Sequence, residues 1–250
     1  MTMLTREQLQ HYLGELLRVD AFDDYAPNGL QVEGRASIRR IVSGVTASLQ
    51  LVQHAAERDA CAILVHHGWF WRGEDPRIVG QRHRRLQALL GAGINLYAYH
   101  LPLDAHPELG NNAQLAARMG WQLEAHFGKQ QLGCIGRAVQ ATRADLAEAL
   151  QRQLGRPVLL VGQAQQPVGR LAWCTGAAQG WIEQAWQAGA DTYVSGEISE
   201  PTAHFAREMG VAYLACGHHA SERYGVQALG EHLAARFGVE HCFIDLDNPA

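Results

Sequence analysis

The chain has 250 residues, 47% of them hydrophobic and 18% charged, which suits one large or two small packed domains and excludes global disorder. Its formal net charge of −4 argues against a large electrostatic surface for nucleic acid. Residues Thr5–Gln8 form a capping-box pattern ahead of leucines at helical spacing, so they indicate a helix and not a signal peptide. No apolar run is long enough to span a bilayer, and we expect a cytoplasmic protein without a membrane segment.

The cysteines include no C-x-x-C pair, and most of them stand among apolar or small residues typical of strand interiors. They are Cys61, Cys134, Cys174, Cys216 and Cys242. We expect buried thiols in a reducing compartment, without a disulfide or metal-binding role.

An internal repeat organises the chain. Residues 40–47 predict a strand and a turn, followed by a helix and by a second strand that ends before His66 and His67. The same order begins again at residues 170–177, where the second strand leads to Gly196 and Glu197. On this alignment Glu197 is the counterpart of His67.

Each half then continues with a helix, a glycine, a strand and an H-x-x-x-[D/E] segment, which is His100–Asp104 in the first half and His218–Glu222 in the second. Pro102 disfavours a regular helix between His100 and Asp104, so we expect a loop there. The first half has a longer excursion at residues 69–82. Between the halves, the pattern predicts a helix over 143–154, capped by Thr142 and ended by Gly155.

Strands that alternate with helices in both halves predict an α/β fold of two duplicated lobes with mainly parallel strands. We place the first lobe at residues 1–125 and the second at residues 126–250. In such sheets ligands gather outside the carboxyl ends of the strands. The repeat therefore predicts that both halves direct polar groups into one cleft, with a di-metal site between the lobes.

Several imidazoles and a carboxylate that bridges two cations are what a two-metal site needs. Taken singly, each of these residues fits an ordinary structural role at least as well: His66 and His67 as a core and a surface histidine, Asp104 as a cap, and His218 with Glu222 as a surface pair. Their joint occurrence at matching ends of a repeat favours metal binding. Either His218 or His219 could be the ligand, although only His218 has the i, i+4 spacing to Glu222. Three further histidines stay ambiguous: His83, His106 and His204.

The excursion and the residues after it are rich in arginine. These arginines are Arg72, Arg77, Arg82, Arg84 and Arg85. Beside a metal site they would grip a phosphorylated substrate. They would equally form an ordinary solvent-exposed face. Lys129 is the only lysine, so arginine serves as the basic residue almost everywhere in this chain and does not by itself indicate phosphate binding. Pro27-Asn28-Gly29 reads as a plain turn.

Long segments of the chain resemble the NIF-three-like family, which is often labelled type 2 GTP cyclohydrolase I. The segments are DYAPNGLQVEG, VHHGWFWRGE, HLPLDAHPELGNN, SGEISE and GHHASERYG. The resemblance runs through essentially the whole chain. It implies two interlinked α/β lobes, a ring-shaped homohexamer, and metal ligation by His66, His67, Asp104, His218 and Glu222. His100 and Glu197 match family positions near the site, where we expect catalytic roles in proton transfer.

Our first hypothesis is a metal-dependent hydrolase with two divalent cations per subunit, zinc, iron or manganese. Hydroxide held by the metals would attack a nucleotide-type substrate, which the family label suggests is GTP, and the arginine-rich excursion would hold its triphosphate. The alternative is a metal-binding ring with a regulatory or DNA-damage-related role and no cyclohydrolase activity. Nucleic acid remains an open partner for that alternative, although the net charge argues against strong duplex binding.

Overall fold

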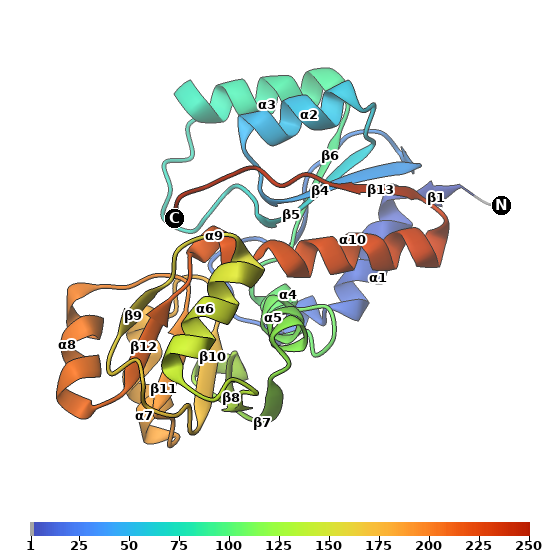
Figure 1. Cartoon of the computed structure of the whole chain (residues 1–250). Helices are drawn as coiled ribbons and strands as arrows, with labels where there is room; N and C mark the ends of the chain where they lie inside the picture. The colour runs from blue at the N-terminus through green and yellow to red at the C-terminus, as the bar shows by residue number, and fades with distance from the viewer. Residues whose placement is uncertain (1–2) are drawn as a thin grey trace. The chain divides into compact units, whose positions relative to one another are not determined.

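The computed structural model describes residues 3–250, which divide into two units (Figure 1). The first unit takes the chain up to Leu109 together with Gly225–Asp247, and the second takes Gly110–Tyr224 with Asn248–Ala250. The sequence pattern placed the division between residues 125 and 126. In the structure the chain instead leaves the first unit at Leu109 and returns to it at Gly225, so the second unit is an insertion into the first.

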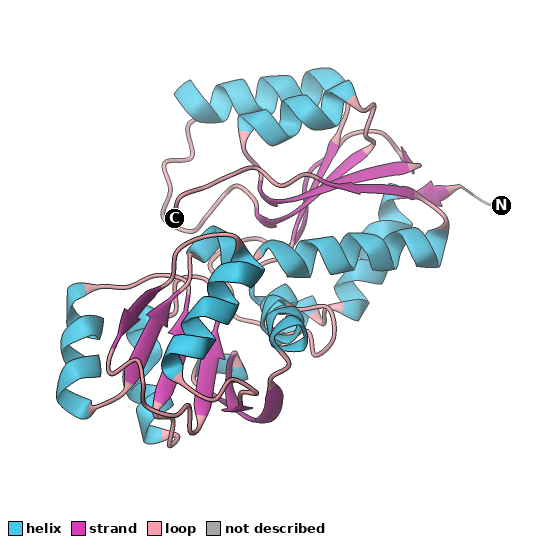
Figure 2. Ribbon diagram, viewed as in Figure 1, coloured by secondary structure: helices cyan, strands magenta, loops and turns pink. Residues whose placement is uncertain are grey.

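A five-stranded sheet forms the centre of the first unit (Figure 2). In spatial order its strands are β13 (Glu240–Phe243), β4 (Arg40–Thr46), β5 (Ala62–His67), β6 (Asn95–Ala98) and β2 (Gly29–Val32), with β1 (Leu4–Thr5) and β3 (Ser37–Ile38) as a separate pair. All neighbours in the sheet are parallel except β2, which runs antiparallel to β6 at the edge. Strands β4, β5 and β6 are buried along most of their length, as expected where helices cover both faces of a parallel sheet.

Helices cover this sheet on both faces. They are α1 (Arg6–Leu16), α2 (Leu49–Glu57), α3 (Gly80–Ala92) and α10 (Arg223–Phe237), with the short helices η1 (Val19–Ala21) and α4 (Leu101–Asp104). On one face α2 and α3 pack Leu51 and Leu89 into a cluster with Ile63 of β5. On the other, α1 and α10 pack Leu13 and Leu229 against the sheet, and the two helices lie side by side in Figure 1. The predicted capping box at the start of α1 is confirmed.

The second unit has a six-stranded sheet whose centre is parallel and whose edges are antiparallel. In spatial order its strands are β7 (Gln122–Phe127), β8 (Gly133–Arg137), β10 (Leu171–Cys174), β11 (Thr192–Ser195), β12 (Ala212–Ala215) and β9 (Leu159–Val161). Its helices are α5 (Asn111–Met119), η2 (Lys129–Gln131), α6 (Arg143–Leu154), η3 (Gln179–Trp181), α7 (Ile182–Gln187), α8 (Glu200–Met209) and α9 (His218–Ser221).

The faces of this second sheet are covered by different pairs of helices. Leu115 of α5 and Leu146 of α6 pack with the fully buried Trp173 of β10. On the opposite face, Ala185 of α7 packs with Tyr193 of β11, and α8 belongs to the same cluster. The predicted cap of α6 by Thr142 and its end at Gly155 are both confirmed, with Gly155 in the left-handed conformation (φ +70°).

The predicted repeat is confirmed as an order of elements within each unit. In the first unit β4, α2, β5, α3 and β6 lead to α4, and in the second β10, α7, β11, α8 and β12 lead to α9. The expected loop between His100 and Asp104 is wrong, because Leu101–Asp104 is a helical turn. Pro102 stands in its first turn, where a missing N–H leaves no helical bond unmade.

Four of the five cysteines are buried, as expected, and Cys242 is exposed. None of the five forms a disulfide with another described residue. Among residues 3–250, no helix combines the length and the apolar character that crossing a membrane requires.

Candidate metal centre

Three histidines of the first unit lie together at the carboxyl ends of β5 and β6. One ligand nitrogen from each of His66, His67 and His100 lies within 4.8 Å of the others. The ring centroids of His66 and His67 are 4.7 Å apart, although these residues are neighbours in a strand. Because β5 ends at His67, the alternation of side chains no longer forces the two rings to opposite faces. The strand end therefore brings both adjacent histidines into one cluster.

The orientation of His66 is fixed by a backbone hydrogen bond. Its Nδ1 lies 2.9 Å from the carbonyl oxygen of Tyr99, so Nδ1 carries the proton and donates it. Its Nε2 lies 3.5 Å from Oδ1 of Asp104, which the helical turn α4 presents. His66 is fully buried and the Asp104 side chain is 13% exposed. An imidazole held at Nδ1 with Nε2 facing a carboxylate is the usual arrangement of a metal-ligating histidine.

His100 is held by an acid that the sequence reasoning missed. Oδ1 of Asp24 accepts a hydrogen bond from Nδ1 of His100 at 2.9 Å, and the Asp24 side chain is only 3% exposed. The turn that follows Asp24 completes the support, because Oδ1 of Asn28 accepts a hydrogen bond from the His100 backbone N–H at 2.7 Å. The only signal in the sequence was an acid just ahead of a Pro-Asn-Gly turn, which gave no indication of a partner 76 residues away.

Asp24 is a buried carboxylate that accepts hydrogen bonds only. Besides His100, its donors are the backbone N–H of Ala26 and Leu101 and the side-chain amide of Asn28. Burial raises the pKa of Asp24, but the hydrogen bond and charge of His100 together with the other donors outweigh burial and hold the pKa well below its usual value. The ionised form is thus favoured in the folded chain.

We expect Asp24→Asn to destabilise the chain by about 2–3 kcal/mol at pH 7, because its amide N–H would face groups that also donate. The folded pKa is depressed, so this contribution is present above the unfolded pKa near 4 and is lost as the pH falls below it. Urea unfolding at a series of pH values measures both effects. The stability gap between wild type and variant should shrink below about pH 4.

The adjacent acid provides a matched control for that experiment. The side chain of Asp23 is 70% exposed and pairs with Arg72 at 3.7 Å, so Asp23→Asn should cost less than about 0.5 kcal/mol. A cost for Asp24→Asn as small as that of the control would show that Asp24 does not support the cluster.

A histidine of the second unit lies between two acids. Nδ1 of His218 is 2.7 Å from Oε1 of Glu197, and its Nε2 is 3.1 Å from Oε2 of Glu222. Glu222 is nearly buried, with 4% of its side chain exposed, whereas Glu197 is 40% exposed. His218 begins α9 and Glu222 directly follows it, so the predicted i, i+4 spacing does place both side chains in contact.

Electrostatics make His218 basic when it carries no metal. Burial lowers its pKa, but the hydrogen bonds and charges of Glu222 and Glu197 are stronger and raise the pKa to about 9. A cation bound at Nε2 would take the place of a proton between the same two groups. The environment that favours the protonated ring therefore favours a metal ion as well.

Glycines allow the backbones of the loops after β10, β11 and β12 to approach one another closely around His218. The backbone N–H of Gly196 donates to the carbonyl of Gly176 at 2.9 Å, and that of Gly217 donates to the carbonyl of Gly196 at 2.8 Å. A Cβ on Gly196 would lie 2.6 Å from Cα of His218, and one on Gly176, which has a φ of +72°, would collide with the carboxylate of Glu222. The chain at these glycines therefore passes too close to His218 and Glu222 for any side chain.

The three histidines left ambiguous by the sequence have ordinary surroundings. Nδ1 of His106 accepts backbone N–H groups of Glu108 and Leu109 in a local turn. His204 forms an exposed i, i+4 pair with Glu200 at 3.7 Å. His83 is exposed on α3. None of them needs a functional role.

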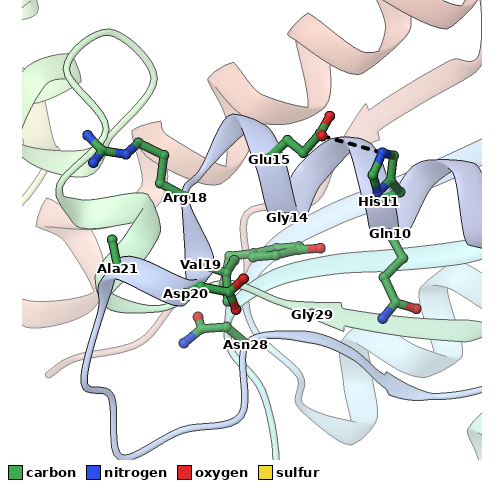
Figure 3. Close-up of a pocket in the computed structure, with 11 residues that line it drawn as sticks. Gln10, His11, Gly14, Glu15, Arg18, Val19, Asp20, Ala21, Asn28 and Gly29 are labelled. Atoms are coloured by element: carbon green, nitrogen blue, oxygen red, sulfur yellow. Dashed lines mark ion pairs between the residues drawn. The ribbon is translucent and has the colours of Figure 1, made fainter.

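The first unit has a cavity of about 810 Å³ lined mainly by α1, η1 and the start of β2 (Figure 3). His11 and Glu15 of α1, an ion pair at 3.4 Å, are among its lining residues. The lining also includes Asn28 and Tyr99, which hold the backbone of His100 and the ring of His66. None of the predicted metal ligands is among the described residues that line this cavity. The cavity is therefore not the candidate metal centre.

Both units are thus α/β sandwiches whose parallel strands end in histidines and carboxylates, residue types that could hold a metal ion. Comparison with known proteins identifies the family to which this fold belongs. Residues 4–249 match the Duf34/NIF3 (NGG1p interacting factor 3) family, and the chain belongs to that family.

Three relatives illustrate the match. A "GTP cyclohydrolase 1 type 2 homolog" of Pseudomonas aeruginosa is 56% identical over 91% of this chain and 91% of its own length. One of the same name from Allochromatium vinosum is 53% identical over 97% of this chain and 96% of its own length. The solved structure of "protein ybgI, unknown function" superposes with a TM-score of 0.94 at 45% identity, covering 99% of this chain and all of that one. The predicted fold and family are confirmed.

Proposed function

We propose that the chain is a metal-dependent hydrolase that binds two divalent cations through His66, His67, Asp104, His218 and Glu222. The observation that carries this proposal is the orientation of His66 and His218. Each has Nδ1 held by a hydrogen bond, to the Tyr99 carbonyl and to Glu197 respectively, while Nε2 faces a carboxylate. Surface histidines do not need such support, whereas metal-ligating histidines do.

The donor set fits divalent cations. Imidazole nitrogens together with carboxylate oxygens suit zinc, iron or manganese. Calcium prefers a larger set of oxygen ligands than this site offers. His66, His67 and Asp104 of the first unit are one part of this set, and His218 with Glu222 is the other. We propose that both parts serve one centre, because His218 and Glu222 alone are too few ligands for a structural or catalytic site.

When bound, the metal ions would supply Lewis acidity and lower the pKa of water near neutral pH. The chain's own residues would then handle protons and orientation. Asp24 accepts the Nδ1–H of His100, which leaves Nε2 of that ring as the basic nitrogen that can take or return a proton. Glu197 holds Nδ1 of His218, so we propose that it positions this ring.

The substrate class in this proposal is a nucleotide. The support is the name "GTP cyclohydrolase 1 type 2 homolog" that the curated relatives carry, together with the aromatic rings around His100. A purine ring can stack on such aromatic rings, but stacking does not distinguish one base from another. The aromatic rings therefore do not select GTP over other nucleotides.

The test is a metal analysis of untagged protein followed by a screen of GTP, other nucleotides and phosphoesters. We expect bound transition metal after purification and hydrolysis of at least one substrate, lost after dialysis against a chelator and restored by zinc, iron or manganese. Protein that holds no metal, or activity indifferent to the chelator, would contradict the proposal. If no formate were released from GTP, GTP cyclohydrolase activity would be excluded, but the metal-dependent hydrolase would not.

The homohexameric ring implied by the resemblance stays a prediction. Multi-angle light scattering at several protein concentrations would measure the mass of the assembly directly. A mass six times that of the chain supports the ring, and a monomer at micromolar concentration contradicts it.

A further inference from the structure

The arginine-rich region between β5 and the middle of α3 has less free positive charge than its sequence suggests. Arg72 pairs with Asp23 at 3.7 Å, and Arg77 pairs with Asp75 at 2.6 Å. Arg82 pairs with Glu74 at 2.6 Å. These acids compensate three of the five guanidinium charges. A triphosphate, with its several negative charges, would have to compete with them for every contact.

Arg85 differs from the other arginines of this region. It is half-buried in α3, and its Nε has no hydrogen-bond partner among the described residues. Burial lowers the pKa of Arg85, and the negative charge of Glu74 offsets only part of that effect. A guanidinium that is partly desolvated, with a nearby acid that offsets only part of the cost, is stabilised further by an anion bound beside it.

A small cavity surrounds Arg85. It measures about 100 Å³, and its lining includes one acid, Glu74, which pairs with Arg82. The other lining residues are Gly68, Trp69, Trp71, Gln81, Arg82 and Arg85. One water molecule occupies about 30 Å³, so the cavity has room for one tetrahedral anion. Arg82 is already paired with Glu74, so an anion here would be bound chiefly by the N–H groups of Arg85 and Gln81, a guanidinium and an amide that suit the oxygens of a phosphate monoester.

This cavity adjoins the histidine cluster within the same unit. Gly68 directly follows His67, and Trp71 lines the cavity with its indole N–H donating to the carbonyl of Gly68 at 3.2 Å. The Trp71 ring lies 5.9 Å from the ring of His67 and 5.1 Å from that of His100. Tyr25, which is 53% exposed, contacts the rings of both Trp71 and His100 at 5.5 and 5.0 Å.

We propose that the cavity at Arg85 binds the single phosphate of a phosphate monoester, while Trp71 and Tyr25 contact a planar ring of the same molecule beside His67 and His100. This proposal rests on the proposed hydrolase function and names its substrate class, a nucleoside monophosphate or another aromatic phosphomonoester in place of a triphosphate. The phosphate anchors the substrate, and the bond that is hydrolysed lies in the part of the molecule that reaches the histidines.

The experiment titrates metal-free protein with inorganic phosphate at constant ionic strength, followed by ³¹P NMR, so that phosphate cannot bind through a metal ion. Wild type should bind phosphate saturably, and Arg85→Gln should weaken binding at least about tenfold, the loss expected for one charge-assisted contact. Arg84→Gln is the matched control, because Arg84 is an exposed neighbour on the same helix that does not line the cavity. It should change the affinity less than twofold.

The proposal is overturned if wild type shows no saturable binding or if Arg85→Gln binds as well as wild type. Equal weakening by both variants would also overturn it, since that shows only diffuse attraction by positive charge. Acetate that binds as tightly as phosphate would refute the assignment of a phosphate. Metal content separates this proposal from the proposed function, because Arg85→Gln should keep its full metal content whatever its affinity for phosphate.

Discussion

Glu222→Gln should lower the affinity of the chain for its metal ions by at least about 100-fold while leaving the fold intact. The substitution preserves the volume of a nearly buried side chain but removes the negative charge that faces Nε2 of His218 at 3.1 Å. A neutral amide is a poor ligand for zinc, iron or manganese, and it would leave the positive charge of a bound cation uncompensated in a buried position. Metal content after dialysis, measured by mass spectrometry, gives the effect directly.

Glu208→Gln is the control for that substitution. Glu208 is an exposed acid of α8 in the same unit, so its replacement removes the same charge without touching the site. Circular dichroism should show both variants folded. If the Glu222 variant retained as much metal as the control after the same dialysis, Glu222 would not be a ligand, and the proposed set of five ligands would be wrong.

Gly196→Ala should destabilise the second unit by about 3 kcal/mol, the upper part of the range for an overfilled site. The added Cβ would lie 2.6 Å from the Gly176 carbonyl oxygen and from Cα of His218, and 2.9 Å from the backbone nitrogen of His218. All three are backbone atoms, so no side-chain rotation relieves the contact. The backbone of His218 must shift, and we also expect metal affinity to fall about tenfold or more because the ligand moves with it.

Gly180→Ala provides the comparison for the stability measurement. Gly180 has no atom within 4 Å of its added Cβ and no positive φ, so its replacement should change the free energy of unfolding by less than about 0.5 kcal/mol. Guanidinium chloride unfolding of both variants measures the difference. A Gly196 variant as stable as the Gly180 variant would mean that the loops after β10 and β11 are free to separate.

Local patterns in the sequence were sufficient for most of the elements. The apolar run that precedes His66, the caps at Thr5 and Thr142 and the glycine at position 155 are signals that involve neighbouring residues only. The repeat extended this reasoning, because two weak H-x-x-x-[D/E] segments at matching positions are more informative than one. The pairing of His218 with Glu222 was predicted in this way and is present in the structure.

Contacts between distant parts of the chain were beyond those patterns. Asp24 supports His100 across 76 residues, and nothing near either residue indicates the other. The prediction of a loop at Pro102 was wrong because a proline in the first turn of a helix has the same sequence appearance as one that ends it. The hypothesis that the arginines bind a triphosphate assumed that each guanidinium was available to a ligand. In the structure three of them are paired with acids.

The insertion of one unit into the other has a consequence for the order in which the protein folds during synthesis. Strand β13 pairs in parallel with β4, with Glu240 opposite Arg40, so the first sheet lacks an edge strand until residues 240–243 leave the ribosome. Helix α10, which covers one face of that sheet, also arrives late. The six strands of the second unit all lie between Gln122 and Ala215, so its sheet can form earlier. The half of the chain that is made first should therefore reach its final state last, with an apolar sheet face that needs protection in the meantime.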